Sequence, residues 1–448
     1  MPVRLPMSDK LIRLRRKPFV RNVSVVAAGT MLAQAISIGF APVITRLYGP
    51  EAFGVLGVFL ACTTLIASVG SLTYDIAIVL PEKDDEARAV ATLAMIIALA
   101  LSLISTLGLL LFREPLIRTF NLESISSLLM LMPLLIFFTA CQKIAMQWLI
   151  RTSQFVRKAW VRIFQSLFLN IAKSGVGLIN PTAMALVVVS TLGEAIHAIM
   201  LIGTPLKRSL SFFRRRPFPP WFCTASILEA AYKHRDFPLY QAPNAVIKNL
   251  TSNLPMLLFA GFFGPIYAGY YALGEKVLKN PSRIISQSVG DVFFARIARA
   301  CNRDEDVGRL LIRVTFGMAV VGVLPFLALA ISGPMVFGVV FGKEWTLGGE
   351  YARWLSIWLF FDFISGPASK TVRVIGIQRF YLIHGVVTSA IRISMLLLGA
   401  LHFRNDLLAV ALFSMAGAGA SIVLIAIVIM ESITYSKIKQ KKQASGLV

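Results

Sequence analysis

The sequence predicts an all-α polytopic membrane protein with about twelve transmembrane helices, arranged in two six-helix bundles related by a pseudo-twofold axis along the membrane normal. Three observations predict this class: long apolar segments, basic residues in every second gap between them, and a weak internal repeat. Of 448 residues, 56% are hydrophobic and only 15% are charged, whereas soluble proteins carry about 25% charged residues. An apolar helix of about 20 residues crosses a hydrocarbon core of about 30 Å.

The expected spans follow the apolar segments of the chain. They lie at 22–46, 53–74, 89–112, 125–150, 160–179, 182–204, 244–263, 266–295, 310–332, 351–372, 380–401 and 407–431. The segment 266–295 is strongly amphipathic and contains Pro281, so it could instead lie in the membrane interface. We expect it to span, because the charges of the gaps alternate correctly only if it crosses.

Basic residues predict the orientation of these spans. Lys and Arg crowd the N-terminus and every second gap, while the intervening gaps hold few. This pattern follows the positive-inside rule and predicts that both termini lie in the cytoplasm. A net charge of +23 would suggest nucleic acid as the partner of a soluble protein. In short cytoplasmic loops, the charge instead fixes topology and contacts anionic membrane lipid, so we expect no nucleic-acid partner.

The longest gap, 205–243, separates six spans from six. It holds Arg214-Arg215-Arg216 and several prolines, and we interpret it as a basic linker that contacts lipid or as a disordered tether. The expected division is a basic cytoplasmic tail at 1–21, an N-terminal six-helix bundle at 22–204, a basic cytoplasmic linker at 205–243, a C-terminal six-helix bundle at 244–431 and a basic cytoplasmic tail at 432–448.

The two halves share a short repeat. Tyr48-Gly49-Pro50-Glu51-Ala52-Phe53-Gly54 recurs as Phe263-Gly264-Pro265-Ile266-Tyr267-Ala268-Gly269, in each case at the turn between the first two spans of a half. An acidic residue follows each copy at a similar distance, as Asp75 and Asp291. Six is an even number of spans, so both halves share an orientation. A parallel repeat of this kind is typical of transporters whose substrate site lies between the halves.

No pattern of residues indicates catalysis, a cofactor or a metal. The histidines His197, His234, His384 and His402 lie far apart, and the cysteines lack metal-binding spacing. The chain has no Gly-x4-Gly-Lys-Ser/Thr phosphate loop, so we do not expect it to hydrolyse ATP. We therefore expect a protein that is not an enzyme and holds no cofactor or metal.

Charged residues inside the apolar segments are the strongest functional candidates, because charge in a membrane is costly. In the segment 266–295, Lys276, Lys279, Arg283, Gln287 and Asp291 fall within an arc of about 120° on one helical face. That face must line a wet cavity or pack against polar partners.

A cationic cavity is therefore predicted. Its candidate substrate-binding residues are Lys248, Asn249, Asn253, Lys276, Lys279, Arg283, Lys143, Lys173 and Arg392. Some of these side chains could instead snorkel to the interface, above all those near helix ends. Because bases outnumber acids in the interior, we expect an anionic substrate, which Lys holds as a point charge and Arg can hold through paired hydrogen bonds.

Interior acids form a second set of candidates. The residues proposed for ion coupling or charge pairing are Asp75, Glu194, His197, Asp291 and Asp362. Glu194 and His197 are spaced i, i+3 on one span, where they could form a proton relay or a structural hydrogen bond between packed helices.

Four stretches carry a family resemblance. The densest runs from Asp236-Phe237-Pro238 through Ser252-Asn253-Leu254-Pro255 to Asp291-Val292-Phe293-Phe294, and the others are Arg46-Leu47-Tyr48-Gly49-Pro50, Asp75-Ile76-Ala77-Ile78-Val79-Leu80-Pro81 and Phe341-Gly342-Lys343-Glu344-Trp345. Together they resemble the bacterial polysaccharide-biosynthesis flippases, the O-antigen and exopolysaccharide exporters of the multidrug/oligosaccharidyl-lipid/polysaccharide exporter superfamily. That family commonly has Glu where Asp75 stands, so a role carried over to this position is weakened.

The resemblance implies two six-helix bundles in the bacterial inner membrane with cytoplasmic termini. It also implies alternating-access movement of a polyprenyl-diphosphate-linked oligosaccharide from the inner to the outer leaflet, for O-antigen or exopolysaccharide biosynthesis. A polysaccharide polymerase and export proteins would be partners. The alternatives are a multidrug/cation antiporter of the same superfamily, which would need cavity acids, a membrane polysaccharide polymerase or ligase, which would normally show a large extracytoplasmic loop, and a membrane scaffold.

Overall fold

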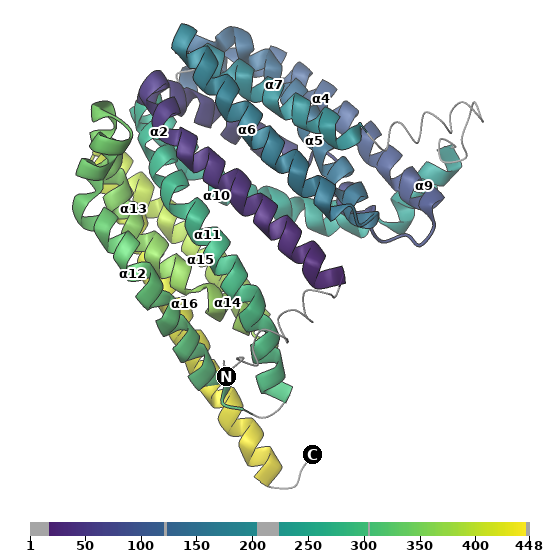
Figure 1. Cartoon of the computed structure of the whole chain (residues 1–448), viewed down its shortest axis with the longest axis vertical. Coiled ribbons are helices and arrows are strands. Elements are labelled where there is room, and N and C mark those ends of the chain that lie inside the picture. The colour runs from purple at the N-terminus through teal and green to yellow at the C-terminus, as the bar shows by residue number, and fades with distance from the viewer. Residues whose placement is uncertain (1–17, 121–122, 204–223, 303–304, 445–448) are drawn as a thin grey trace, which may run out of the picture. The chain divides into compact units, whose positions relative to one another are not determined.

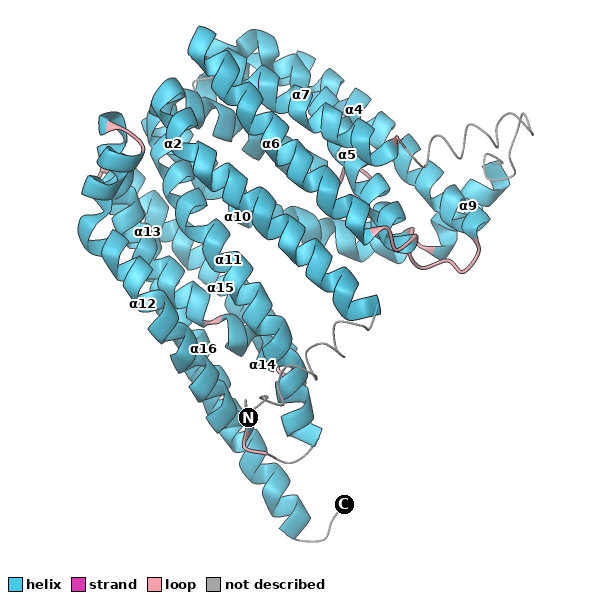
Figure 2. Cartoon of the chain, in the orientation of Figure 1, coloured by secondary structure: helices cyan, strands magenta, loops and turns pink. Residues whose placement is uncertain are grey.

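The structure is a computed structural model that describes residues 18–120, 123–203, 224–302 and 305–444 (Figure 1). This part of the chain is helical throughout and contains no strand (Figure 2). The α-helices are α2 (Pro18–Ala67), α3 (Tyr74–Ala77), α4 (Asp84–Phe120), α5 (Leu131–Arg151), α6 (Phe155–Ile179), α7 (Ala183–Ile202), α9 (Thr224–Lys233), α10 (Ala242–Phe263), α11 (Pro265–Asn302), α12 (Val307–Val340), α13 (Thr346–Ile364), α14 (Gly366–Ile375), α15 (Gln378–Leu397) and α16 (Asp406–Ala444). Short 3-10 turns occupy Glu123–Met130 and Lys343–Trp345, and wide π turns occupy Phe237–Gln241 and Leu398–His402.

Among the described residues, eight helical segments are long and apolar enough to cross a membrane. The first, Val25–Ala67, has 43 residues and bends at Gly49, where φ is +70°. It is long enough for two crossings at about 20 residues each. The helical content confirms the predicted all-α polytopic class, whereas the number of twelve spans stays a prediction.

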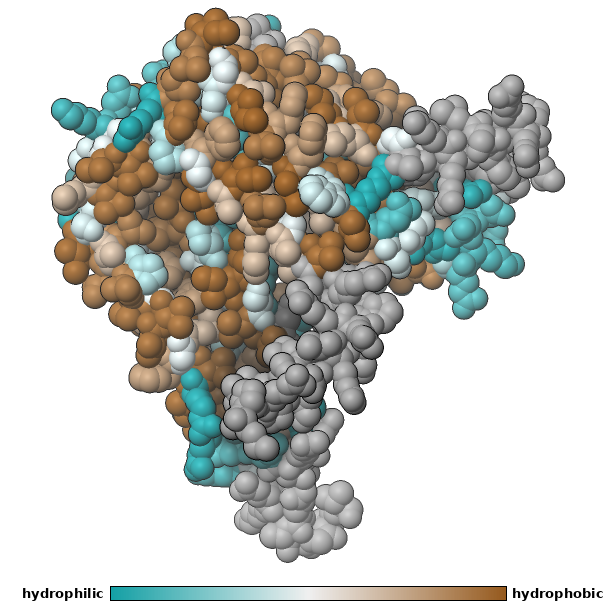
Figure 3. Space-filling view, in the orientation of Figure 1, coloured by the Kyte–Doolittle hydropathy of each residue, from teal (hydrophilic) through white to brown (hydrophobic). Residues whose placement is uncertain are grey.

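The exposed surfaces of the long helices are apolar. Large hydrophobic side chains stand exposed along α4 and α12; among them are Leu103, Leu107, Leu111, Phe316, Leu324 and Ile331, with exposed fractions from 59% to 76%. Hydrophobic side chains cover most of the face seen in Figure 3. Water-exposed apolar surface of this extent is costly for a soluble protein, so these faces are suited to lipid.

One compact unit comprises the residues up to Tyr48 together with Val55–Leu257. Small and polar residues join its helices: a Cβ at Gly29 would lie 3.0 Å from Cα of Ala159, and the Ser166 hydroxyl donates to the carbonyl of Ala33 at 2.7 Å. Without water, helices in a membrane associate through such close packing and interhelical hydrogen bonds.

The other compact unit comprises Gly49–Gly54 and the chain from Leu258 onward. Helix α13 lies at its centre, in contact with α11, α12 and α16. An aromatic core surrounds Phe259, whose ring centroid lies 5.1 Å from that of Tyr271 and 5.7 Å from that of Tyr351. The Tyr351 hydroxyl donates to Asp406 at 2.8 Å, which satisfies the one polar atom of a side chain that has no exposed surface.

The two copies of the internal repeat touch each other within this second unit. A Cβ at Gly54 would overlap the carbonyl oxygen of Pro265 and lie 3.0 Å from N of Gly269. Reciprocally, a Cβ at Gly269 would overlap the carbonyl oxygen of Pro50 and lie 3.1 Å from N of Gly54. Glycine therefore stands at equivalent positions in both copies because only glycine permits this approach of two backbones.

The second half of the predicted linker is folded. Residues 204–223, which hold the triple arginine, lie outside the described residues. Helix α9 packs on α4: the Tyr74 hydroxyl donates to the carbonyl of Ala231 at 3.1 Å, and Lys233 pairs with Glu86 at 2.5 Å. A tether without contacts is therefore wrong for the region that follows residue 223.

Candidate functional site

The polar face of α11 is present and exposed. The helix continues through Pro281 to Asn302, while its opposite side contacts α13 and α14. Lys276, Arg283 and Gln287 are all exposed on the polar face. Among the described residues, neither Lys276 nor Arg283 forms an ion pair. The side chain of Asp291 lies outside the described residues.

Lys279, on the same face, already has a partner. Its Nζ lies 2.6 Å from Oε1 of Glu275, one helical turn earlier, and their side chains are 39% and 21% exposed. Asp362 on α13 is exposed and interacts electrostatically with both Lys279 and Arg392. Lys279 is therefore part of a group of two acids and two bases rather than a free cation.

Arg392 is held inside the second unit by aromatic rings. Its Cζ lies 3.6 Å from the centre of the Trp358 ring and 4.0 Å from that of Phe413. Its Nε and Nη2 are buried and accept no partner among the described residues. A Cβ at Gly417 would lie 3.0 Å from the Arg392 Nε, so the glycine leaves room for the guanidinium. Stacking of this kind suits the flat, weakly hydrated guanidinium group.

The polar residues of α10 differ in their availability. Lys248 is exposed. The amides of Asn249 and Asn253 donate to the carbonyls of Ala245 and Asn249, each at 2.8 Å. These side chains therefore bond their own helix in this conformation, although each keeps an acceptor oxygen.

Lys143 and Asp75 both serve the turn that follows α2. The Lys143 Nζ donates to the carbonyl of Ala67, the last residue of α2, at 2.6 Å, and it interacts electrostatically with Asp75. Asp75 is buried and accepts from the Ser71 hydroxyl at 2.5 Å. A cation at the C-terminus of a helix satisfies a free carbonyl and the helix dipole. This position explains a lysine inside an apolar segment without any substrate.

This turn is also strained. Leu72 and Thr73 have φ values of +46° and +61°, a left-handed conformation that β-branched residues rarely adopt. The Thr73 hydroxyl donates to the carbonyl of Phe237 at 3.0 Å, so the turn is tied to the segment before α10. Lys173 lies elsewhere in the unit, on α6, and its backbone carbonyl accepts from the Tyr48 hydroxyl at 2.9 Å.

Glu194 and His197 belong to a buried hydrogen-bond network across α5, α6 and α7. Gln142 donates to Glu194 Oε2 at 2.8 Å, and its own oxygen lies 3.0 Å from Nδ1 of His197. That Nδ1 must therefore carry a proton and donate it. Gln165 adds a longer contact of 3.5 Å to Glu194. The arrangement joins the two residues through an amide, as expected for structural packing, and leaves Nε2 of His197 buried without a partner.

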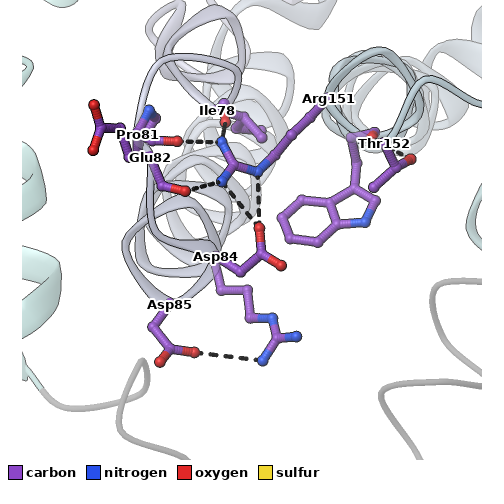
Figure 4. Close-up of polar contacts among 9 residues, drawn as sticks. Ile78, Pro81, Glu82, Asp84, Asp85, Arg151 and Thr152 are labelled. Carbon is purple, nitrogen blue, oxygen red and sulfur yellow. Dashed lines mark hydrogen bonds and ion pairs between the residues drawn. The ribbon is translucent and has the colours of Figure 1, made fainter.

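Arg151, at the end of α5, was not among the sequence candidates. Its guanidinium donates to the carbonyls of Ile78, Pro81 and Glu82 and, through Nε and Nη2, to Asp84 (Figure 4). These contacts use all the directions of its planar fork, and the side chain is only 11% exposed. Arg151 therefore clamps the turn between α3 and α4. A basic residue just after an apolar segment reads as a topology signal, so the sequence concealed this role.

The quoted sequence motifs meet in space. In the second unit, Phe53 packs edge-on against Trp345 at 5.4 Å, and Tyr270 does so at 6.1 Å. Gly49 lies against Glu344, 3.2 Å from the position of an added Cβ. The motifs around these residues thus build turns and helix ends, which explains how they can mark a family without specifying a substrate.

Comparison with known proteins identifies the family. The polysaccharide biosynthesis protein family matches residues 43–347, which is more than half of the chain. The chain belongs to this family. Its fold agrees with that membership: this polysaccharide biosynthesis protein superimposes on lipid II flippase MurJ in an inward closed conformation with a TM-score of 0.68 at 14% identity, over 92% of this chain and 89% of that one. An inward-facing multidrug resistance MATE transporter of the MOP superfamily gives a TM-score of 0.66 at 15% identity, over 92% and 98%.

A curated relative of this polysaccharide biosynthesis protein is the succinoglycan biosynthesis transport protein ExoT of Rhizobium meliloti (strain 1021). The two are 24% identical over 337 residues, which is 74% of this chain. The match spans 64% of the relative, less than two thirds of its length. The flippase and transporter structures establish the fold, and the family establishes polysaccharide biosynthesis as the setting.

Proposed function

We propose that this protein is a flippase that moves an anionic polyprenyl-diphosphate-linked oligosaccharide from the inner to the outer leaflet of the bacterial inner membrane by alternating access. The exposed basic face of α11, with Lys276 and Arg283, carries the proposal. These cations would offset the cost of bringing a charged head group into a region of low dielectric. The relative named as a succinoglycan transport protein and the MurJ-like fold support the same class of substrate.

The proposed roles differ among the candidates. Lys276 and Arg283 would contact the diphosphate directly, with Lys248, Asn249 and Asn253 of α10 as further contacts. Lys143 and Lys173 contribute to the packing of their own unit, through the turn after α2 and through contacts of α6. A role in ion coupling for Asp75, Glu194, His197, Asp291 and Asp362 stays a proposal, as do cytoplasmic termini and partnership with a polysaccharide polymerase, export proteins and anionic lipid.

Reconstitution tests this function. Proteoliposomes containing fluorescent undecaprenyl-diphosphate oligosaccharide should show protein-dependent movement of the lipid between leaflets. A variant with both Lys276→Ala and Arg283→Ala should lose about tenfold or more of the rate, since about 1.4 kcal/mol of lost head-group stabilisation suffices for that change. Lys343→Ala, an exposed lysine in the turn before α13, serves as the matched loss of charge and should leave the rate unchanged. Equal rates in all three proteins would contradict the role of the basic face.

A multidrug/cation antiporter is the second candidate, favoured by the carboxylates of Glu275 and Asp362 on membrane-embedded helices and by the MATE-like fold. Lys279 and Arg392 balance these two charges, so the group offers no surplus of negative charge to a cationic drug. Protein-dependent uptake of a cationic dye in the same liposomes, without movement of the lipid-linked sugar, would favour this function instead.

A further inference from the structure

Lys279 points to a regulated cation within the basic face of α11. Its neighbours along that face, Lys276 and Arg283, are exposed, whereas Lys279 pairs with Glu275 at 2.6 Å. In the proposed function, an anionic head group that reaches Lys276 and Arg283 also reaches the residue between them. It would therefore compete with the Glu275 carboxylate for the same ammonium group.

A second base makes this competition feasible. Glu275 interacts electrostatically with Arg392 as well as with Lys279. Arg392 is fixed against Trp358 and Phe413 and keeps buried N–H groups without a partner. If Glu275 leaves Lys279, its charge therefore still faces a positive group, which limits the cost of separating a buried pair.

Charge balance gives the exchange a direction. Glu275, Lys279, Asp362 and Arg392 sum to zero, so the empty protein holds no uncompensated charge in this group. When a diphosphate binds Lys279, the freed carboxylate of Glu275 lies one turn away and repels the bound anion. That repulsion favours release of the head group once it has crossed.

We propose that Glu275 is an internal counter-anion, which occupies Lys279 until the diphosphate head group displaces it and which then assists release. This inference rests on the proposed function. Glu275 thus acts on substrate affinity through Lys279 rather than by touching substrate. No covalent step is involved; only the partner of one ammonium group changes.

The test measures binding of undecaprenyl diphosphate to the full-length protein in nanodiscs, alongside the leaflet-exchange rate. Glu275→Gln removes the competing charge at almost constant shape. It should tighten binding by about three- to tenfold, the range expected when a helical ion pair in a partly dry site is lost, and it should slow exchange at saturating lipid. Lys279→Ala should weaken binding, and the double variant should match Lys279→Ala because no cation is left to uncover.

Helix α13 supplies a matched control. Glu350 pairs with Arg353 at 3.0 Å, and the two side chains are 30% and 39% exposed, close to the values for Glu275 and Lys279. Glu350→Gln should therefore leave binding and exchange unchanged. Excess inorganic pyrophosphate should compete with the lipid, which would show that the diphosphate rather than the polyprenyl chain is recognised.

Each outcome separates the two ideas. If the original protein binds the lipid but Glu275→Gln binds no more tightly, the counter-anion is refuted and the flippase function stands. Tightening that persists in the double variant would also refute it, because the uncovered cation would not be Lys279. If neither the original protein nor Glu275→Gln binds undecaprenyl diphosphate, both proposals fail.

Discussion

The contact between the two repeat copies predicts that Gly54→Ala strongly destabilises the protein. The new methyl group would occupy the space of the Pro265 carbonyl oxygen and lie 3.0 Å from N of Gly269. Both obstacles are backbone atoms, so no side chain can turn aside. The helices α2 and α11 must separate by on the order of 1 Å, which also forfeits dispersion contacts along their crossing.

The magnitude follows from two opposing effects. Overpacking of a rigid contact costs about 1–3 kcal/mol or more, whereas replacing glycine by alanine inside a helix gains about 0.5–1 kcal/mol. We therefore expect a net loss of about 2 kcal/mol or more for Gly54→Ala. Gly39→Ala, on the same helix, meets no atom within 4 Å, so it should be neutral or slightly stabilising.

The assay is thermal unfolding of the purified protein in detergent, with all variants under the same conditions. Gly54→Ala should unfold at a clearly lower temperature than Gly39→Ala, and Gly269→Ala should behave like Gly54→Ala because its own contact with the Pro50 carbonyl is equivalent. If Gly54→Ala proved as stable as Gly39→Ala, the close crossing of the two repeat copies would be refuted.

Three further predictions concern side chains that hold the units together. Arg151→Lys should lower stability by about 2 kcal/mol, because an ammonium cannot reproduce the fork that serves three carbonyls and Asp84; unchanged thermal unfolding would contradict this. Lys233→Met should speed hydrogen exchange in α9 and leave α5 unaffected. Because hydrogen bonding to Glu86 raises the pKa of Lys233 above 10.5, the same loosening should appear in the unaltered protein only as pH rises beyond that value, and loosening near pH 7 would count against the pairing. Arg392→Lys should lower stability by about 1 kcal/mol through lost contact with Trp358 and Phe413, detectable as a lower unfolding temperature than that of Arg373→Lys, which alters an exposed arginine of α14.

The sequence by itself determined the class of the protein and the position of its polar helical face. Apolar length and loop charge depend only on local composition, and a helix fixes its own side-chain directions, so Lys276, Arg283 and Gln287 could be placed on one face of α11 before any tertiary contact was known. The repeat around Gly54 and Gly269 was visible for the same reason, because glycine and proline mark backbone geometry wherever they occur.

Only the tertiary structure decided which charges have partners. Lys143 lies far from Ala67 in the chain, and Arg392 lies far from Trp358, so no pattern along the sequence could reveal that one caps a helix and the other stacks on an aromatic ring. Arg151 looked like a topology signal but is a clamp, and the region after residue 223 looked like a linker but packs on α4. A charged side chain acquires its role from the groups within a few ångströms of it, and in a helical membrane protein those groups come from other helices.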